Sequence, residues 1–213
     1  MPIQGLGVPK VVFTLALLTQ AALVIPSGAE QIAGPDNEGG ISGAPAPVFH
    51  SRAGSKLTIH TGFQNGGGES WRFIQEAKPG VVKIMDNFGD NGANVARIKQ
   101  LSPGAIVVGR IYHVNEPGDG DPEQRARDWW DRNKARIRSA PGVDYWEGYN
   151  EFATGQESDN ADKARWFARF EAERVRILAG EGLRACIGSF SVGTPPVNNP
   201  EHWKALYPAI DEA

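Results

Sequence analysis

One structural unit recurs along the sequence from residue 56 onward, and this repetition constrains the fold more than any other feature. Each unit has a glycine-containing turn, a short apolar run, a polar loop and then a stretch with helical spacing. The turns are at residues 78–80, 102–104, 140–142 and 180–182, and the apolar runs are at residues 56–61, 81–85, 105–111, 143–149 and 183–190. Strands that alternate with helices in this way predict an α/β fold with a parallel sheet covered by helices.

The stretches between these runs carry signals for the start and the end of helices. Asp121 and Pro122 predict the start of one helix, with aspartate as the N-cap and proline in the first turn. A second helix is expected over residues 161–178, and Gly180 is expected to end it.

Two architectures fit this alternation: an open, doubly wound sheet and a closed (β/α)8 TIM barrel. Such a barrel needs about 250 residues, whereas this chain has 213. Five strand-and-helix units can be counted, and the last helix begins at residues 200–203. The barrel interpretation therefore makes residues 50–213 the N-terminal part of an incomplete (β/α)8 domain, with strands one to about five.

The N-terminal residues have the pattern of a secretion signal. A single positive charge at Lys10 precedes an apolar run over residues 11–24, and a small-x-small site follows at residues 27–29. A membrane anchor is the alternative, but polar residues interrupt the run, and it is short for the roughly 20 residues that a span needs. We expect a signal peptide at residues 1–29, a secreted or periplasmic location, and no stable membrane span after its removal. Residues 30–49 are rich in Gly, Ala and Pro, which predicts a linker.

Charge and cysteine content exclude several classes of partner and cofactor. A net charge of -3 and a pI near 5.8 provide no basic field, so no nucleic-acid partner is expected. The single cysteine, Cys186, excludes an intramolecular disulfide and is interpreted as a small buried strand residue. The acidic loop at residues 119–123 lacks the rest of a calcium-binding loop, and the glycines at residues 66–68 lack the lysine of a phosphate-binding loop. No metal and no cofactor are expected, and the sequence does not define the oligomeric state.

The strongest local motif is Trp-Glu-Gly-Tyr-Asn-Glu at residues 146–151, at the end of the strand expected over residues 143–149. In a βα barrel, this end of a strand faces the active site. The motif resembles the fourth strand of clan A glycoside hydrolases, where an Asn-Glu pair, often preceded by aromatic residues, closes the strand. Proline often follows the pair in that clan, whereas this sequence has Phe152.

The resemblance implies that Glu151 is the general acid/base and that Asn150 hydrogen-bonds the 2-hydroxyl group of the sugar. Glycoside cleavage needs a carboxylic acid that protonates the leaving oxygen, and a second carboxylate about 5 Å away if configuration is retained. In the clan, this nucleophile is a glutamate at the end of strand seven, and no seventh strand is found in this sequence. The chain alone is therefore expected to be inactive.

Polar residues also follow the strand expected over residues 105–111. His113 is interpreted as a substrate contact, with Arg110 and Tyr112 as weaker ones, because many clan members place such side chains near the sugar. A hydrogen-bonded structural histidine is the alternative for His113. An Asn-Glu-Pro sequence at residues 115–117 spells a commoner form of the motif, but a turn and the start of a helix explain it.

Glu147 is the other glutamate of the motif. It shares a strand face with Glu151 but lies about 13 Å away at about 3.3 Å per residue, which is too far for the second carboxylate. We expect it to form a buried pair with Lys83 or Arg110.

The residues and the resemblance together favour a secreted retaining O-glycosyl hydrolase that acts on a poly- or oligosaccharide. One alternative is a noncatalytic secreted carbohydrate-binding or assembly protein with a shortened barrel. Another is an unrelated α/β hydrolase or oxidoreductase with an open sheet. Three tryptophans at helical spacing are expected to pack helices against the sheet rather than to form platforms for sugar rings: Trp129, Trp130 and Trp166.

Overall fold

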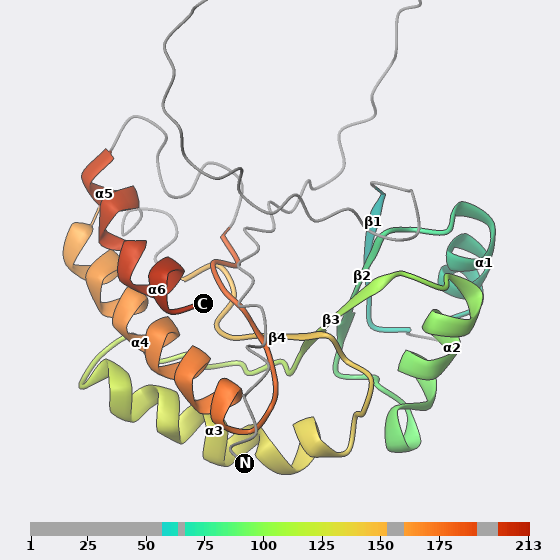
Figure 1. Ribbon diagram of the computed structural model, residues 1–213, viewed down its shortest axis with the longest axis horizontal. Coiled ribbons are helices and arrows are strands. Elements are labelled where there is room, and N and C mark those ends of the chain that lie inside the picture. Colours follow the sequence, from blue (N-terminus) through green and yellow to red (C-terminus); the bar gives the residue numbers. More distant parts are fainter. Residues whose placement is uncertain (1–56, 64–66, 153–159, 191–199) are drawn as a thin grey trace, which may run out of the picture.

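A five-stranded parallel sheet forms the centre of the computed structural model, which describes residues 57–63, 67–152, 160–190 and 200–213 (Figure 1). The strand order is β1-β2-β3-β4-β5, and each neighbouring pair is parallel. The strands are β1 (Thr58–Thr61), β2 (Val81–Met85), β3 (Ile106–Arg110), β4 (Tyr145–Glu147) and β5 (Ala185–Cys186). The expected parallel sheet is therefore confirmed, although β4 and β5 are shorter than the apolar runs that predicted them.

Helices alternate with the strands and form an arc around the outside of the sheet (Figure 1). Asp121 caps the helix after β3, because its side chain accepts the backbone N–H of Gln124 at 2.7 Å. The helix after β4 ends at Gly180, as the sequence predicts. The helices are α1 (Gly68–Ala77), the 3₁₀ turn η2 (Asp90–Gly92), α2 (Ala93–Leu101), α3 (Pro122–Arg138), α4 (Ala161–Gly180), α5 (Pro200–Ala205) and α6 (Tyr207–Glu212).

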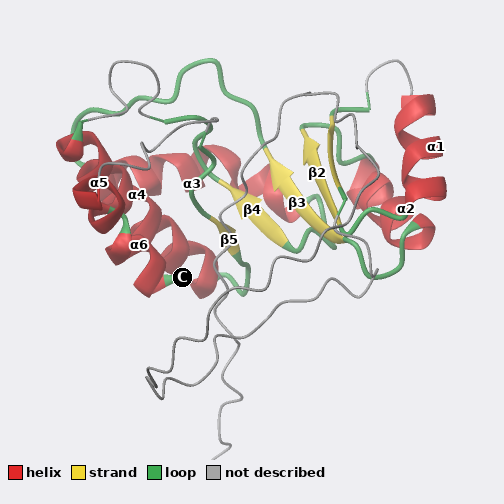
Figure 2. Cartoon of the chain, turned by 90° about the horizontal axis from the view of Figure 1, so that it is seen from above, coloured by secondary structure: helices red, strands yellow, loops and turns green. Residues whose placement is uncertain are grey.

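The two faces of the sheet pack differently. One face, which includes Val82, Val107 and Trp146, belongs to a large apolar core that it shares with the helices. The other face forms a separate small cluster, and among the described residues its members all come from strands: Val108, Tyr145 and Cys186, with Val81 and Ile106 packed against them. Figure 2 shows the strands with the helices beside and behind them.

The described part of the chain can be compared with both expected architectures. A doubly wound sheet has helices on both faces and reverses its strand order at a switch point. Here the strand order follows the sequence, and the helices share their core with one face only. The fold is thus compatible with part of a (β/α)8 barrel, in which strands follow one another and helices form the outer layer.

The ends of β4 and β5 are fastened to α4 by one buried arginine. Arg174 has no exposed surface, and it donates to the main-chain oxygens of Trp146 at 2.8 Å and of Cys186 at 2.6 Å. Its Nε also donates to Glu171 at 3.0 Å, so a carboxylate balances the buried charge. Arg174 therefore fixes the strand end that leads to the Asn-Glu motif.

Several expectations about burial are confirmed. Cys186 is a buried strand residue, and burial raises the pKa of its thiol to about 12. Trp129 and Trp130 lie in the apolar core, and Trp166 packs partly buried against it.

Among the described helices, none has the length and apolar character that a membrane span requires. The signal peptide and linker expected at residues 1–29 and 30–49 lie outside the described residues.

Candidate functional site

The Asn-Glu pair lies just beyond the carboxyl end of β4, between the segments that follow β3 and β5. Asn150 forms an isolated parallel bridge with Ser189, and the backbone N–H of Glu151 donates to the main-chain oxygen of Ser189 at 2.7 Å. From the other side, the backbone N–H of Asn150 donates to Oε2 of Glu116 at 2.8 Å. We refer to Arg110, Glu116, Asn150, Glu151 and Ser189 as the strand-end cluster.

Glu151 has an exposed side chain on a strained backbone. Its φ of 52° lies in the left-handed region, which costs a residue with a Cβ roughly 1–2 kcal/mol. Residues held in such conformations occur preferentially at functional sites, where the surrounding structure holds them. Here the Ser189 oxygen holds the Glu151 amide, and the carboxylate remains accessible to solvent.

The side chain of Asn150 is oriented by Ser189. The Ser189 hydroxyl donates to Oδ1 of Asn150 at 3.2 Å, and Asn150 is only partly buried. The amide oxygen is therefore engaged within the protein, and Nδ2 has no hydrogen-bond partner among the described residues.

Glu116 is a member of the strand-end cluster, and the sequence did not predict this role for it. The Asn-Glu-Pro sequence at residues 115–117 was expected to be only a turn and the start of a helix, but the Glu116 carboxylate folds back to meet Asn150 and Arg110. Burial raises the pKa of Glu116, while the Asn150 N–H and the Arg110 guanidinium oppose this rise. One signal could have identified Glu116, since it too follows the carboxyl end of a strand.

Arg110 lies between two carboxylates. Its Nη2 is 3.4 Å from Glu116 and its Nε is 3.6 Å from Glu147, and the side chain is buried. Its guanidinium also lies 5.7 Å from the centre of the Tyr112 ring. The structure thus places Arg110 in an ion-pair network, and its expected contact with a substrate stays a prediction.

Glu147 forms the buried pair that strand alternation predicts. Nζ of Lys83 lies 2.7 Å from its carboxylate, and both side chains are almost completely buried. This confirms the expected pairing, and Arg110 adds a second, longer contact. The Glu147 carboxylate is therefore paired with the side chains of Lys83 and Arg110.

The other residues expected to contact a substrate lie beside Glu116. His113 is partly buried, and its Nε2 lies 2.9 Å from Oδ1 of Asn133 on α3, the kind of bond expected of a structural histidine. Tyr112 is half exposed, and its backbone N–H donates to Asp86 at 3.0 Å. The structure thus gives His113 a partner within the protein and leaves the Tyr112 ring open to solvent.

Two further titratable residues border the network. The pKa of His60 on β1 is lowered first by desolvation and then by the charge of Lys83. Burial, and after it the charge of Glu116, raises the pKa of Tyr149 to about 12. The Tyr149 ring stacks on Phe170 at 4.3 Å, so the residue before Asn150 is anchored in the core.

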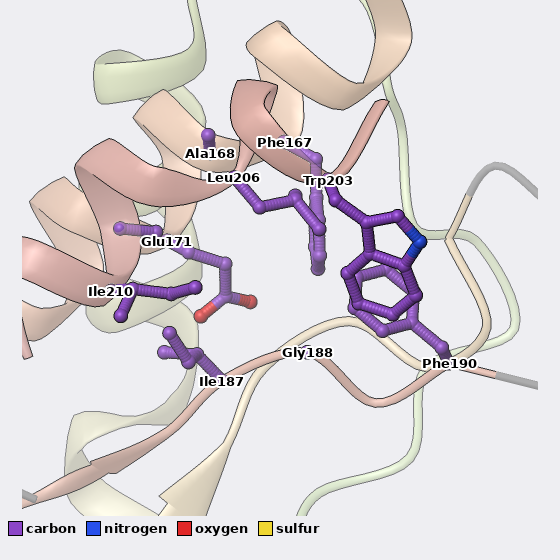
Figure 3. Close-up of a pocket in the computed structure, with 10 residues that line it drawn as sticks. Phe167, Ala168, Glu171, Ile187, Gly188, Phe190, Trp203, Leu206 and Ile210 are labelled. Carbon is purple, nitrogen blue, oxygen red and sulfur yellow. The ribbon is translucent and has the colours of Figure 1, made fainter. Parts of the chain in front are cut away.

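An apolar pocket lies elsewhere, between α4, the segment after β5 and the helices α5 and α6 (Figure 3). It encloses about 350 Å³ of empty space, part of it open to solvent. Glu171 is the one carboxylate in its lining, and Arg174 binds it. Aromatic and aliphatic side chains make up most of the remaining lining: Phe167, Phe190, Trp203, Leu206 and Ile210.

The described residues contain no group of three or more His, Cys, Asp or Glu side chains that could hold a metal ion. The chemistry that the strand-end cluster offers is that of one accessible carboxylate, Glu151, next in sequence to the primary amide of Asn150. Comparison of the chain with protein-family models, with curated proteins and with solved structures found no match.

Proposed function

We propose that this chain carries the acid/base half of a secreted retaining O-glycosyl hydrolase that acts on a poly- or oligosaccharide. Glu151 protonates the leaving oxygen and later activates water, and Asn150 binds the sugar. One observation carries the proposal. The Asn-Glu pair lies beyond the carboxyl end of β4 and is held by Glu116 on the β3 side and by Ser189 on the β5 side.

Position and strain support this role for Glu151. Active sites of (β/α)8 enzymes lie at the carboxyl ends of the strands. Glu151 combines that position with an accessible carboxylate and a left-handed backbone.

The hydrogen bonds of Asn150 suit it to bind a sugar hydroxyl. Because Oδ1 accepts the Ser189 hydroxyl, Nδ2 points its two hydrogens elsewhere. It can donate to the oxygen of a 2-hydroxyl group, as the resemblance to clan A implies. The exposed ring of Tyr112 offers an apolar surface for the C–H face of a neighbouring sugar.

Retention of configuration requires a second carboxylate about 5 Å from the first. Glu116 is bound by Asn150 and Arg110, and Glu147 is bound by Lys83. Neither carboxylate is therefore free to attack a sugar. We place the nucleophile outside the described residues, on a further βα unit. The 213-residue chain alone is then expected to bind saccharide without turning it over.

The test uses the protein translated from the complete reading frame that contains residues 50–213. Glu151→Gln should slow hydrolysis of oligosaccharides and alkyl glycosides by about 10²–10⁴-fold, the usual contribution of general acid–base catalysis. The kcat/KM for a 2,4-dinitrophenyl glycoside should fall much less, because kcat/KM reports the first step and that leaving group needs little protonation. Glu69→Gln, at an exposed glutamate paired with Arg72, is the matched control. An equal fall in kcat/KM with both kinds of leaving group would reject the acid role of Glu151.

A noncatalytic carbohydrate-binding protein is the second possibility, and one observation favours it: in the described part of the chain, Glu116 and Glu147 near the motif are both ion-paired. In that case the translated protein would bind oligosaccharides, with NMR signals of Tyr112 and Asn150 shifting on titration. It would hydrolyse none of them.

A further inference from the structure

We infer that Glu116 is the positioning residue that sets the orientation of Asn150 and Glu151. This inference rests on the proposed function, which gives Glu151 the acid/base role. The carboxylate comes from the loop after β3, 34 positions away from Asn150 in the sequence. It acts on Glu151 through the backbone rather than by touching the substrate.

The first argument is the pair of backbone hydrogen bonds that brackets the motif. Two consecutive amides have acceptors on opposite sides: the Asn150 N–H binds Glu116 at 2.8 Å, and the Glu151 N–H binds Ser189 at 2.7 Å. Together they fix the planes of the two peptide groups that meet at the Cα of Asn150. Because the left-handed φ of Glu151 is unfavourable, removal of either acceptor should let this segment relax.

The second argument is the buried network that holds Glu116 itself. Arg110 lies 3.4 Å from Glu116 and 3.6 Å from Glu147, and Lys83 lies 2.7 Å from Glu147. These contacts link β2, β3 and β4 beneath the motif. A charged acceptor that is itself fixed by packing and by ion pairs forms a stronger and better-defined bond than a mobile one.

The third argument is the accessibility of the groups involved. The Glu116 side chain is 14% exposed, whereas Glu151 is exposed. A carboxylate that is already bonded on both oxygens has little capacity left for a ligand. Glu116 is therefore suited to hold the motif in place, and Glu151 is suited to meet the substrate.

The test measures backbone hydrogen exchange in the 213-residue chain, resolved by residue with NMR. Glu116→Ala should accelerate exchange at Asn150 by about tenfold, since the partly buried acceptor of its N–H is lost. Glu116→Gln should restore part of the protection, because its side-chain oxygen can accept the same N–H. Glu123→Gln is the matched control and should leave Asn150 unchanged, because Glu123 lies on α3 and its carboxylate pairs with Arg169 of α4.

The pattern of exchange separates positioning from a general loss of stability. A positioning role predicts acceleration confined to Asn150 and Glu151, with amides of β2 and β3 unchanged. Uniform acceleration across those strands, or unchanged protection at Asn150, would overturn the inference. Ser189→Ala gives a second check, since loss of its hydroxyl should leave the Asn150 N–H protected while the side-chain amide becomes mobile.

A second readout uses the translated protein of the complete reading frame. Glu116→Ala should lower kcat with little change in KM, because binding groups remain while the acid is misaligned. If Glu116→Ala accelerates exchange at Asn150 and Glu151 but the translated protein cleaves no glycoside, the proposed function is rejected and the positioning of Asn150 by Glu116 stands. Normal kcat in Glu116→Ala would reject the positioning role alone.

Discussion

Nζ of Lys83 on β2 lies 2.7 Å from the carboxylate of Glu147 on β4, and the two side chains are 2% and 1% exposed. Arg110, on the strand between them, lies 3.6 Å from the same carboxylate. The three charges form a buried layer on the face of the sheet that does not share the helical core. Arg110 belongs both to this layer and to the strand-end cluster, so it connects the two.

The first prediction concerns this buried pair. Glu147→Gln leaves Lys83 and Arg110 without their shared carboxylate, so it should lower the free energy of unfolding by about 3–5 kcal/mol. Lys83→Met should cost less, because Arg110 still faces Glu147. The double variant Lys83→Met/Glu147→Gln should lose less than the sum of the two single losses. Urea unfolding of the three variants measures the cycle, and additive losses would contradict the pairing.

The second prediction concerns the pH dependence that Glu116 contributes. Its folded pKa is raised above the ordinary value of 4.5, first by desolvation. The folded protein therefore keeps the Glu116 proton to a higher pH than the unfolded chain does. This contribution to stability is present below about pH 4.5 and is lost as the pH rises through the folded pKa. Glu116→Gln removes the titration. Its free energy of unfolding relative to wild type should increase between pH 4.5 and 7.5 in urea titrations, and a decrease over that range would contradict the raised pKa.

The third prediction concerns the close approach of α4 to the end of β4. A Cβ at Gly148 would lie 2.5 Å from Nε of Arg174 and 2.7 Å from Oε1 of Glu171. Arg174 cannot move away without releasing the carbonyls that it binds. Gly148→Ala should therefore destabilise the protein by about 1–3 kcal/mol in thermal or urea unfolding.

Gly180 provides the matched control for this substitution. It is the last residue of α4, and a Cβ there would have no neighbour within 4 Å. Gly180→Ala should be neutral or stabilising by up to about 1 kcal/mol, because alanine favours the helix. Equal losses of unfolding free energy for the two variants would show that the close approach of Arg174 is not the reason why Gly148→Ala is destabilising.

The order of strands and helices could be predicted because its signals are local. Glycine-containing turns, apolar runs and caps such as Asp121 are visible within a few residues. The strand lengths could not be predicted in the same way. The apolar runs at residues 143–149 and 183–190 extend beyond the paired residues of β4 and β5, since pairing depends on the neighbouring strand.

In the candidate site too, features set by local sequence could be predicted, and features that depend on distant residues could not. Alternation along β4 was enough to predict that Glu147 forms a buried pair. The role of Glu116 was missed because a loop brings it to Asn150 over 34 positions. His113 had two open interpretations in the sequence, and the bond to Asn133 depends on how α3 packs beside that loop.

Chemical rescue with azide tests the acid/base assignment of Glu151 most directly. The measurement uses Glu151→Ala in the protein translated from the complete reading frame, with a 2,4-dinitrophenyl glycoside as the substrate. Azide needs no base to attack the glycosyl intermediate, so it should restore turnover and yield a glycosyl azide with the configuration of the substrate. An azide-independent rate with no glycosyl azide, or wild-type turnover by Glu151→Ala, would contradict the assignment.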